Sequence, residues 1–341
     1  MNFLRQFALN AKPLVSVVVA SYNHQDYVQA CLQSVLSQDF QDFEIVITDD
    51  GSSDETVANI QAIQDKRIHL KVLPQNSGAC IALNDAILRA RGKFVAVLNS
   101  DDFFLPGKLS LQVSYLQSHP QVGAVFGLPC FVNEQGQEIV DPAHRDSGAF
   151  KAAEKTRHQW LRYFFDEGNA LCHPTVLIRR CLYQQLGLYD PRLAQVPDLD
   201  MWIRLATSTQ IRVLAKPLTA FRVRDGLMNA SAGRPEVIVR DAWERARILR
   251  HYAAMPEHEL GLIFPEFLPR SEPLAVQLAR YALDKPYPFF HRFALDLWFD
   301  SLPSAVKTRG WLNLQRESPQ AWQEFINKTG QTDLHKIYSK E

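Results

Sequence analysis

The chain lacks an excess of charge of either sign. Its 37 basic residues balance 37 acidic residues among 341, so the formal net charge is zero. Without an overall positive field, the protein does not attract nucleic acid or anionic lipid through net charge alone. Any anionic ligand must therefore be held by a local site, and we expect no nucleic-acid partner.

Long apolar runs are also missing. Residues 1–12 contain Arg5 and Lys12 but no apolar segment of secretory length, and no later segment stays apolar over the length of a membrane-spanning helix. We therefore expect a cytoplasmic protein that neither enters the secretory route nor spans a membrane. Peripheral contact with the inner face of a membrane stays open.

Closely spaced cysteine pairs, which bind zinc or form redox dithiols, are absent. The five cysteines are scattered along the chain and none forms a C-x-x-C motif. They are Cys31, Cys80, Cys130, Cys172 and Cys181. We expect all five to be reduced.

The sequence does contain short apolar segments that alternate with amphipathic segments of helical length. This alternation is typical of βαβ units and predicts an α/β fold, a mainly parallel sheet flanked by helices. The apolar runs predict strands at residues 14–20, 43–48, 68–73 and 94–98. Helices are predicted at residues 27–36, 57–63 and 79–90.

Two local signals predict where these helices begin and end. Ser52, with Glu55 three residues later, predicts a capping box at the start of the second helix. Gly92 predicts a left-handed residue that closes the third helix.

The later part of the chain has a mixed pattern. It predicts helices at 109–117 and 198–206, strands at 122–126, 211–214 and 218–223, and loops at 141–158 and 225–235. We expect one domain over 1–235, with a first half at about 14–102 and a second half at about 103–235.

Residues 236–341 predict a separate helical region, because apolar positions recur at helical spacing between prolines. Its aromatic stretch at 287–299 favours helix packing against the main domain over contact with a membrane or a lipid-linked acceptor.

Polar residues follow the predicted strands at the edge where open parallel sheets bind their ligands. Four carboxylates gather there, at Asp49, Asp50, Asp101 and Asp102. Like charges raise one another's pKa unless a cation or a network of donors absorbs the charge. Oxygen ligands without a His or Cys cluster favour Mg²⁺ or Mn²⁺ held together with phosphates, and so predict a diphosphate ligand. Each motif alone is also explained as a turn with a helix cap.

Two segments carry a resemblance to a known family. They are residues 15–56, VSVVVASYNHQDYVQACLQSVLSQDFQDFEIVITDDGSSDET, and residues 92–102, GKFVAVLNSDD. Both resemble the start of a family 2 glycosyltransferase of the GT-A fold, of the bacterial surface-polysaccharide type. The resemblance covers roughly residues 14–224 and does not extend to the C-terminal helices.

The resemblance implies roles for the residues at this edge. Ala20, Tyr22 and Asp50 would line the pocket for the nucleotide base, with Asp50 accepting a hydrogen bond from a base N–H. Asp101 would meet the ribose or the metal, and Asp102 would hold the Mn²⁺ or Mg²⁺ that bridges the phosphates. The remaining donor-binding candidates at the edge are Asn23, Ser52 and Ser100. The family often has Asp where Asn99 stands, and an amide supplies no charge.

A general base is predicted in the segment that begins at Pro197. In similar enzymes an acidic pair precedes an aromatic residue and an arginine at the start of a helix, and this alignment makes Asp198 the base that deprotonates the acceptor. Pro197 stands where the family often has Glu, and Asp200 is the alternate base. Asp198 could instead serve only as a helix N-cap, with Asp200 favouring the helix dipole.

Three further residues are candidates for the donor site. His173 could contact the donor phosphate or the acceptor, although a single histidine beside an apolar strand is more often a core residue. Arg222 and Arg224 follow a predicted strand and could steady the leaving diphosphate through charge-assisted hydrogen bonds.

The sequence therefore predicts an inverting, metal-dependent transfer from a nucleotide sugar, a UDP-sugar by preference, to a hydroxyl of a growing glycan or lipid-linked acceptor. A sugar nucleotidyltransferase is the weaker alternative, because residues 20–24 (ASYNH) contain no glycine to cradle a phosphate. A nucleotide-sugar-binding protein without activity is the other, motivated by Asn99 and Pro197.

Overall fold

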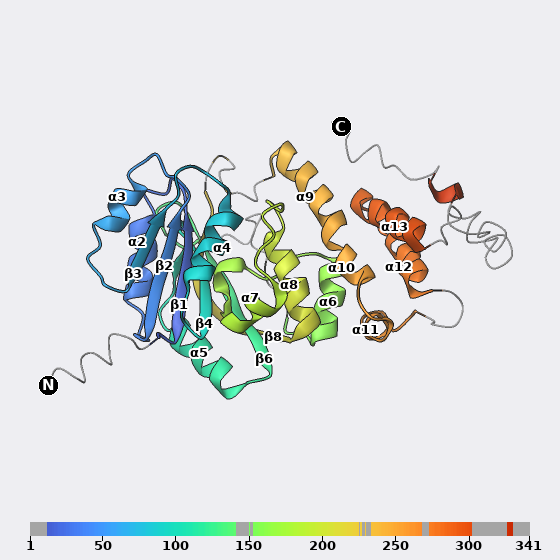
Figure 1. Ribbon diagram of the computed structural model, residues 1–341, viewed down its shortest axis with the longest axis horizontal. Coiled ribbons are helices and arrows are strands. Elements are labelled where there is room, and N and C mark those ends of the chain that lie inside the picture. Colours follow the sequence, from blue (N-terminus) through green and yellow to red (C-terminus); the bar gives the residue numbers. More distant parts are fainter. Residues whose placement is uncertain are drawn as a thin grey trace. The chain divides into compact units, whose positions relative to one another are not determined.

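The chain divides into two compact units, Met1–Asn229 and Ala230–Glu341 (Figure 1). The computed structural model describes residues 12–140, 150, 153–224, 226, 229, 233–267, 273–301 and 326–329.

The first unit is built around one sheet of eight strands in the order β3-β2-β1-β4-β7-β6-β8-β5. The strands are β1 (Val15–Ser21), β2 (Phe43–Asp49), β3 (Ile68–Val72), β4 (Phe94–Asn99), β5 (Phe103–Phe104), β6 (Val122–Val132), β7 (Leu177–Arg179) and β8 (Gln210–Arg222). Strand β7 is antiparallel to both β4 and β6, and β5 is antiparallel to β8. The other six strands run in one direction, so their carboxyl ends lie at one edge of the sheet.

Helices cover both faces of this sheet (Figure 1). They are α2 (Val28–Leu36), α3 (Thr56–Gln61), α4 (Ala79–Arg89), α5 (Lys108–Ser118), α6 (Arg157–Asp166), the 3₁₀ helix η1 (His173–Thr175), α7 (Arg180–Leu186) and α8 (Pro197–Ser208). Alternate residues of a strand face opposite sides of a sheet. Val17 and Val19 of β1 belong to a buried cluster with Leu32 of α2 and Leu109 of α5, whereas α4 packs against β1 and β2.

The first four predicted strands are confirmed to within one residue at each end, because apolar runs that are buried on both faces are easily recognised. The two strands predicted at 211–214 and 218–223 are one strand, β8. The predicted loop at 141–158 is wrong at its end, since α6 begins at Arg157 with Thr156 as its N-cap. Residues 141–149 and 151–152 lie outside the described residues.

Both predicted helix-end signals are wrong. The side chain of Ser52 bonds to Asp49 rather than to the start of α3, whose N-cap is Glu55 and has no side-chain cap. Gly92 is not left-handed. It is needed because the chain passes close to β1: a Cβ at Gly92 would lie 2.6 Å from the amide nitrogen of Ser16 and 2.7 Å from the carbonyl carbon of Val15.

The substitution Gly92→Ala is therefore expected to lower the free energy of unfolding by about 1–3 kcal/mol, since backbone atoms must move to admit the methyl group. Gly261→Ala is the matched control, because a Cβ there meets no atom within 4 Å. In a helix this change is expected to stabilise by about 0.5–1 kcal/mol. Urea denaturation measures both, and an unchanged midpoint for Gly92→Ala would contradict the close approach.

The second unit is helical over its described residues. Its helices are α9 (Pro235–Ile248), α10 (Arg250–Ala253), α11 (Glu257–Ile263), α12 (Leu274–Leu283) and α13 (Pro288–Ser301). Helix α13 packs against α9 and α12 and buries Phe290, Phe293 and Trp298. Most of the aromatic stretch thus packs within its own unit, while Tyr287 and Phe299 are exposed.

The structure also bears on the cysteines and on membrane-spanning helices. All five cysteines are free, three of them buried. Within the described part of the chain, no helix has both the length and the apolar character needed to cross a membrane.

Candidate active site at the carboxyl edge of the sheet

Asp49 ends β2, and donors from two loops surround its carboxylate. Ser21 Oγ donates to Asp49 Oδ2 at 2.5 Å, and Ser52 donates to Oδ2 from its hydroxyl and to Oδ1 from its amide. Asn23 joins this turn in a left-handed conformation with φ of 50°, which Asn tolerates better than most residues, and donates its N–H to Ser52 Oγ. These contacts of Asn23 and Ser52 hold the ends of β1 and β2 together.

Asp50 lies beside the start of α4. It is buried, and its two carboxylate oxygens accept the backbone N–H groups of Ser77, at 2.7 Å, and Gly78, at 2.9 Å. Its own N–H donates to Ser21 O at the end of β1. Asp50 therefore fixes the loop before α4 to the carboxyl edge.

Two other base-pocket candidates lie at the same edge. Ala20 pairs with Thr48 on one side and Asn99 on the other within the sheet. Tyr22 follows β1 and is 41% exposed, so its ring is accessible to a ligand.

Asp102 is enclosed at the end of β4. Its carboxylate accepts the side-chain N–H of Asn99 at 2.8 Å and the backbone N–H of Arg222 at 2.7 Å, one at each oxygen. Burial raises its pKa well above the usual value, and the charge of Asp101 raises it further. The side-chain amide of Asn99 therefore donates a hydrogen bond that an aspartate at this position could not donate when ionised.

Asp101 differs from the other three carboxylates. Asp49, Asp50 and Asp102 each accept protein hydrogen bonds at both oxygens. No donor among the described residues bonds the side chain of Asp101, which is 15% exposed. Asp101 is therefore the carboxylate that stays available to a ligand.

His24 follows β1 and connects three of the loops. Its Nδ1 lies 2.7 Å from Ser100 Oγ, and its Nε2 lies 3.2 Å from Arg224 Nη1. Burial lowers the pKa of His24, Asp101 partly offsets this, and Arg224 lowers the pKa further.

The two arginines at the end of β8 are used differently. Arg222 is buried, and its guanidinium donates to the carbonyl oxygens of Asp101, Asn133 and Glu134. It therefore holds the loops after β4 and β6. Arg224 bonds His24, and its Nε is buried without a hydrogen-bond partner among the described residues. Of the two arginines, Arg224 has the donor to spare.

Asp198 lies in the first turn of α8, where Pro197 is the first residue. Asn169 Nδ2 donates to Asp198 Oδ2 at 2.6 Å, and the Leu199 N–H lies 2.8 Å from Oδ1. The side chain of Asp198 is partly exposed. A carboxylate held at both oxygens in a partly desolvated place has the environment that a general base needs.

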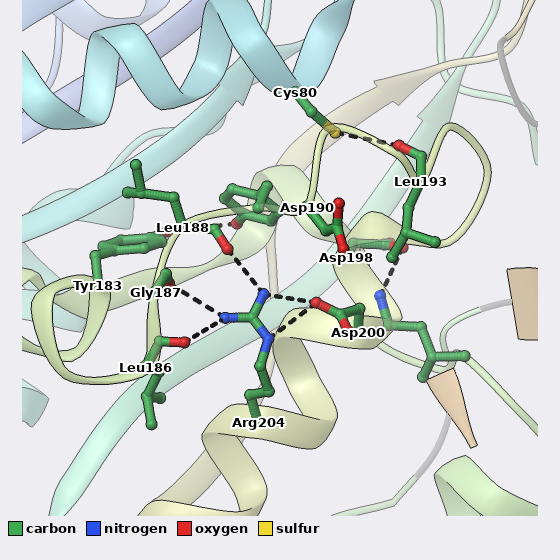
Figure 2. A network of polar contacts seen from close by, with 12 residues as sticks. Cys80, Tyr183, Leu186, Gly187, Leu188, Asp190, Leu193, Asp198, Asp200 and Arg204 are labelled. Atoms are coloured by element: carbon green, nitrogen blue, oxygen red, sulfur yellow. Dashed lines mark hydrogen bonds and ion pairs between the residues drawn. The ribbon is translucent and has the colours of Figure 1, made fainter. Parts of the chain in front are cut away.

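Asp200 is occupied by an ion pair. It is buried and accepts two N–H groups of Arg204, at 2.6 and 2.9 Å, and Arg204 also donates to the carbonyl oxygens of Leu186, Gly187 and Leu188 (Figure 2). This network ties the end of α7 to α8. The carboxylate of Asp200 is therefore engaged by Arg204.

His173 has the character of a core residue. Its Nε2 lies 2.9 Å from the hydroxyl of Tyr189, and its ring contacts that of Trp202 at 5.7 Å between centroids. Burial lowers its pKa to about 4, so the imidazole is neutral at neutral pH.

The thiol of Cys172, just before η1, is buried. Burial raises its pKa, and the charges of both Asp102 and Asp198 raise the pKa further. Both carboxylates therefore act electrostatically on the same thiol.

Among the described residues, no three His, Cys, Asp or Glu side chains are arranged to hold a metal ion. Of the four carboxylates that follow β2 and β4 in the described structure, Asp101 alone has a side chain without a protein donor. A cation held there would need ligands from a bound substrate, as Mg²⁺ sites with one or two carboxylates and phosphate oxygens do.

Comparison with known proteins follows this geometry. Residues 16–181 match the model of the family described as Glycosyl transferase family 2. The chain carries a family 2 glycosyltransferase domain. The matched residues include the ends of β1, β2 and β4, and they stop before Asp198, Arg222 and Arg224.

Two curated relatives of this glycosyltransferase have descriptive names. The putative teichuronic acid biosynthesis glycosyltransferase TuaG of Bacillus subtilis is 44% identical over 31% of this chain and 43% of its own length. The UDP-Glc:alpha-D-GlcNAc-diphosphoundecaprenol beta-1,3-glucosyltransferase WfaP of Escherichia coli is 38% identical over 31% of this chain and 42% of its own length. The alignments thus span less than half of either relative.

Solved structures share the fold over nearly the whole chain. S. aureus TarS 1-349, in complex with UDP-GlcNAc, has a TM-score of 0.61 at 22% identity and covers 93% of this chain and 89% of its own. The mannosyltransferase PcManGT from Pyrobaculum calidifontis, in complex with GDP-Man and Mn²⁺, has a TM-score of 0.53 at 17% identity and covers 97% of this chain and 89% of its own. The glycosyltransferase therefore has the GT-A fold.

Two residues of the site were not predicted as functional. His24 follows β1 at the ligand-binding edge, so its position could have marked it. Asn169, which bonds Asp198, lies in a short segment between α6 and η1 without a recognisable sequence signal.

Proposed function

We propose that this glycosyltransferase moves a sugar from a UDP-sugar to a hydroxyl of a growing glycan or lipid-linked acceptor, with inversion at the anomeric carbon. The observations that carry the proposal are two carboxylates: Asp101, after β4, has no side-chain hydrogen bond from a donor among the described residues, and Asp198, at the start of α8, accepts one from Asn169. The carboxylate of Asp101 could bind a cation that also contacts phosphate, and the carboxylate of Asp198 could accept the proton of an acceptor hydroxyl.

In the proposed reaction, the acceptor oxygen attacks the anomeric carbon while Asp198 takes its proton. The bond from that carbon to the diphosphate breaks at the same time, and UDP leaves with the electron pair. Asn169 holds the carboxylate in the orientation that receives the proton. Direct displacement of this kind inverts the anomeric centre.

We assign the cation to Asp101, with Asp102 behind it, and the diphosphate to Arg224. Bound Mn²⁺ or Mg²⁺ would neutralise charge that develops on the leaving diphosphate. Asp101 fits a hard divalent ion because it is a free oxygen ligand, whereas both oxygens of Asp102 accept protein hydrogen bonds. Arg224 fits an oxyanion because its buried Nε needs an acceptor.

The remaining assignments follow from this donor site. Ala20, Tyr22 and Asp50 belong to the base pocket of a nucleotide-binding half, about 14–102, and Asp198 to an acceptor half, about 103–235. The names of TuaG and WfaP support a role in surface polysaccharide synthesis, and that of WfaP a lipid-linked acceptor. A lipid-linked acceptor would bring a cytoplasmic enzyme to the inner face of the membrane.

A thermal-shift screen of nucleotides with Mn²⁺ or with EDTA tests this proposal. UDP with Mn²⁺ is expected to raise the melting temperature of the first unit by roughly 5–10 °C at about 100 times its Kd, and UDP with EDTA much less. A UDP-sugar that binds but is neither hydrolysed nor transferred would indicate a binding protein instead. A shift with other nucleotides but not with UDP would contradict the assigned donor.

A further inference from the structure

One nitrogen of the His24 imidazole contacts both a cation and a carboxylate. Its Nε2 is 3.2 Å from Arg224 Nη1 and 3.9 Å from Asp101 Oδ2. The ring of Tyr27 meets the imidazole edge to face at 5.9 Å between centroids. Among the described residues, Arg224 and Asp101 form no ion pair with each other, and Nε2 is the atom that contacts both.

The hydrogen bonds of His24 define its tautomer. A guanidinium can only donate, so Nε2 must accept from Arg224 and carries no proton. The ring proton is then on Nδ1, which donates to Ser100 Oγ at 2.7 Å. His24 thus presents a bare nitrogen towards Asp101 and gives that carboxylate no hydrogen bond.

Arg224 is held on one side and free on the other. His24 accepts from Nη1, and the guanidinium lies 5.3 Å from the centroid of Tyr27, but Nε is buried without a partner in the described structure. A buried N–H that lacks an acceptor is costly, so this group favours a ligand that brings one.

Removing the ring would change this arrangement. An arginine and a carboxylate with nothing between them form a short, often bidentate ion pair. Such a pair would occupy the donor of Arg224 that an oxyanion needs and the oxygen of Asp101 that a cation needs.

We propose that His24 is a positioning residue that keeps Arg224 and Asp101 apart, so that the guanidinium stays available to the donor phosphate and the carboxylate to the divalent cation. The proposal rests on the proposed function, because it assumes that both groups bind the nucleotide sugar. It adds a residue that touches neither ligand but determines whether both can bind.

Two substitutions of similar size separate this role from a merely structural one. His24→Asn keeps a donor for Ser100 but leaves the space next to Arg224 empty. His24→Gln can place its amide oxygen near the position of Nε2 and accept from Arg224. Calorimetry with UDP in Mn²⁺ is expected to show roughly 10- to 100-fold weaker binding for His24→Asn, the range for residues that position metal ligands, and near wild-type binding for His24→Gln.

A double variant tests the cause. Arg224→Gln alone is expected to weaken UDP binding. In the His24→Asn background it should not weaken UDP binding further, because the ion pair between residue 224 and Asp101 can no longer form. Losses that add in the double variant would overturn the proposal, as would wild-type affinity in His24→Asn. If the Asn variant does not fold, the Gln variant decides: wild-type affinity supports the proposal, and a loss of tenfold or more overturns it.

The wild-type protein distinguishes this proposal from the function on which it rests. If wild type binds UDP equally in Mn²⁺ and in EDTA, the proposed function fails and the role of His24 fails with it. If wild type shows the Mn²⁺ dependence and both His24 variants match it, only the role of His24 is overturned.

Discussion

Asp198→Asn is expected to lower kcat by about 10²–10⁴-fold while leaving the affinity for UDP within about twofold of wild type. The amide has the size of the carboxylate but cannot take a proton from the acceptor. Donor affinity should hold because the groups assigned to the diphosphate, Asp101 and Arg224, are untouched. Kinetics of UDP release from the donor sugar and calorimetry with UDP measure the two effects separately.

Asp200→Asn is the matched control on the same helix. The carboxylate of Asp200 pairs with Arg204, which also bonds three backbone carbonyls, so the substitution is expected to lower the melting temperature and retain turnover. If Asp198→Asn turns over normally and Asp200→Asn does not, the base has been assigned to the wrong residue.

Asp101→Asn is expected to remove the Mn²⁺ dependence of UDP binding. Of Asp49, Asp50, Asp101 and Asp102, only Asp101 has a side chain without a donor among the described residues, and an amide oxygen is a weaker, uncharged ligand for a hard cation. In Mn²⁺, the variant should therefore bind UDP as weakly as the wild type does in EDTA. Its affinity for UDP should be at least about tenfold lower than that of the wild type in Mn²⁺. Calorimetry with each protein in Mn²⁺ and in EDTA gives the comparison.

Asp26→Asn controls for the change of charge. Asp26 is exposed in the loop after β1 and lies close to His24 in the sequence, but it has no hydrogen bond in the described structure. UDP affinity should change by less than about twofold, since an exposed charge is well screened. Equal losses in the Asp101 and Asp26 variants would mean that net charge, and not a ligand position, controls the binding of UDP.

The strands of the first half could be predicted because their information is local. Residues 43–49 are buried throughout, as are most of 94–99, so the apolar runs appear directly in the sequence. The short strands β5 and β7 have two and three residues and exist only through their neighbours in the sheet. Gly92 shows the same limit, since its requirement comes from β1, far away in the chain.

The location of the candidate site could be predicted from the sequence, but the role of each residue in it could not. The position after a strand identified Asp49, Asp50, Asp101 and Asp102 together, yet only their partners distinguish them. Those partners come from distant positions, such as Gly78 for Asp50 and Arg222 for Asp102. Sequence alone could not show that three of the carboxylates are bonded at both oxygens and that one is not.

The central claim is that Asp101 holds a divalent cation beside a diphosphate at the carboxyl edge of the sheet. Crystals grown with UDP and Mn²⁺ test it most directly through the anomalous scattering of manganese. The account predicts one strong peak in direct contact with an Asp101 oxygen and a diphosphate oxygen, with Arg224 at the phosphates. A peak bound elsewhere, or UDP bound at this edge without manganese and away from Asp101, would contradict it.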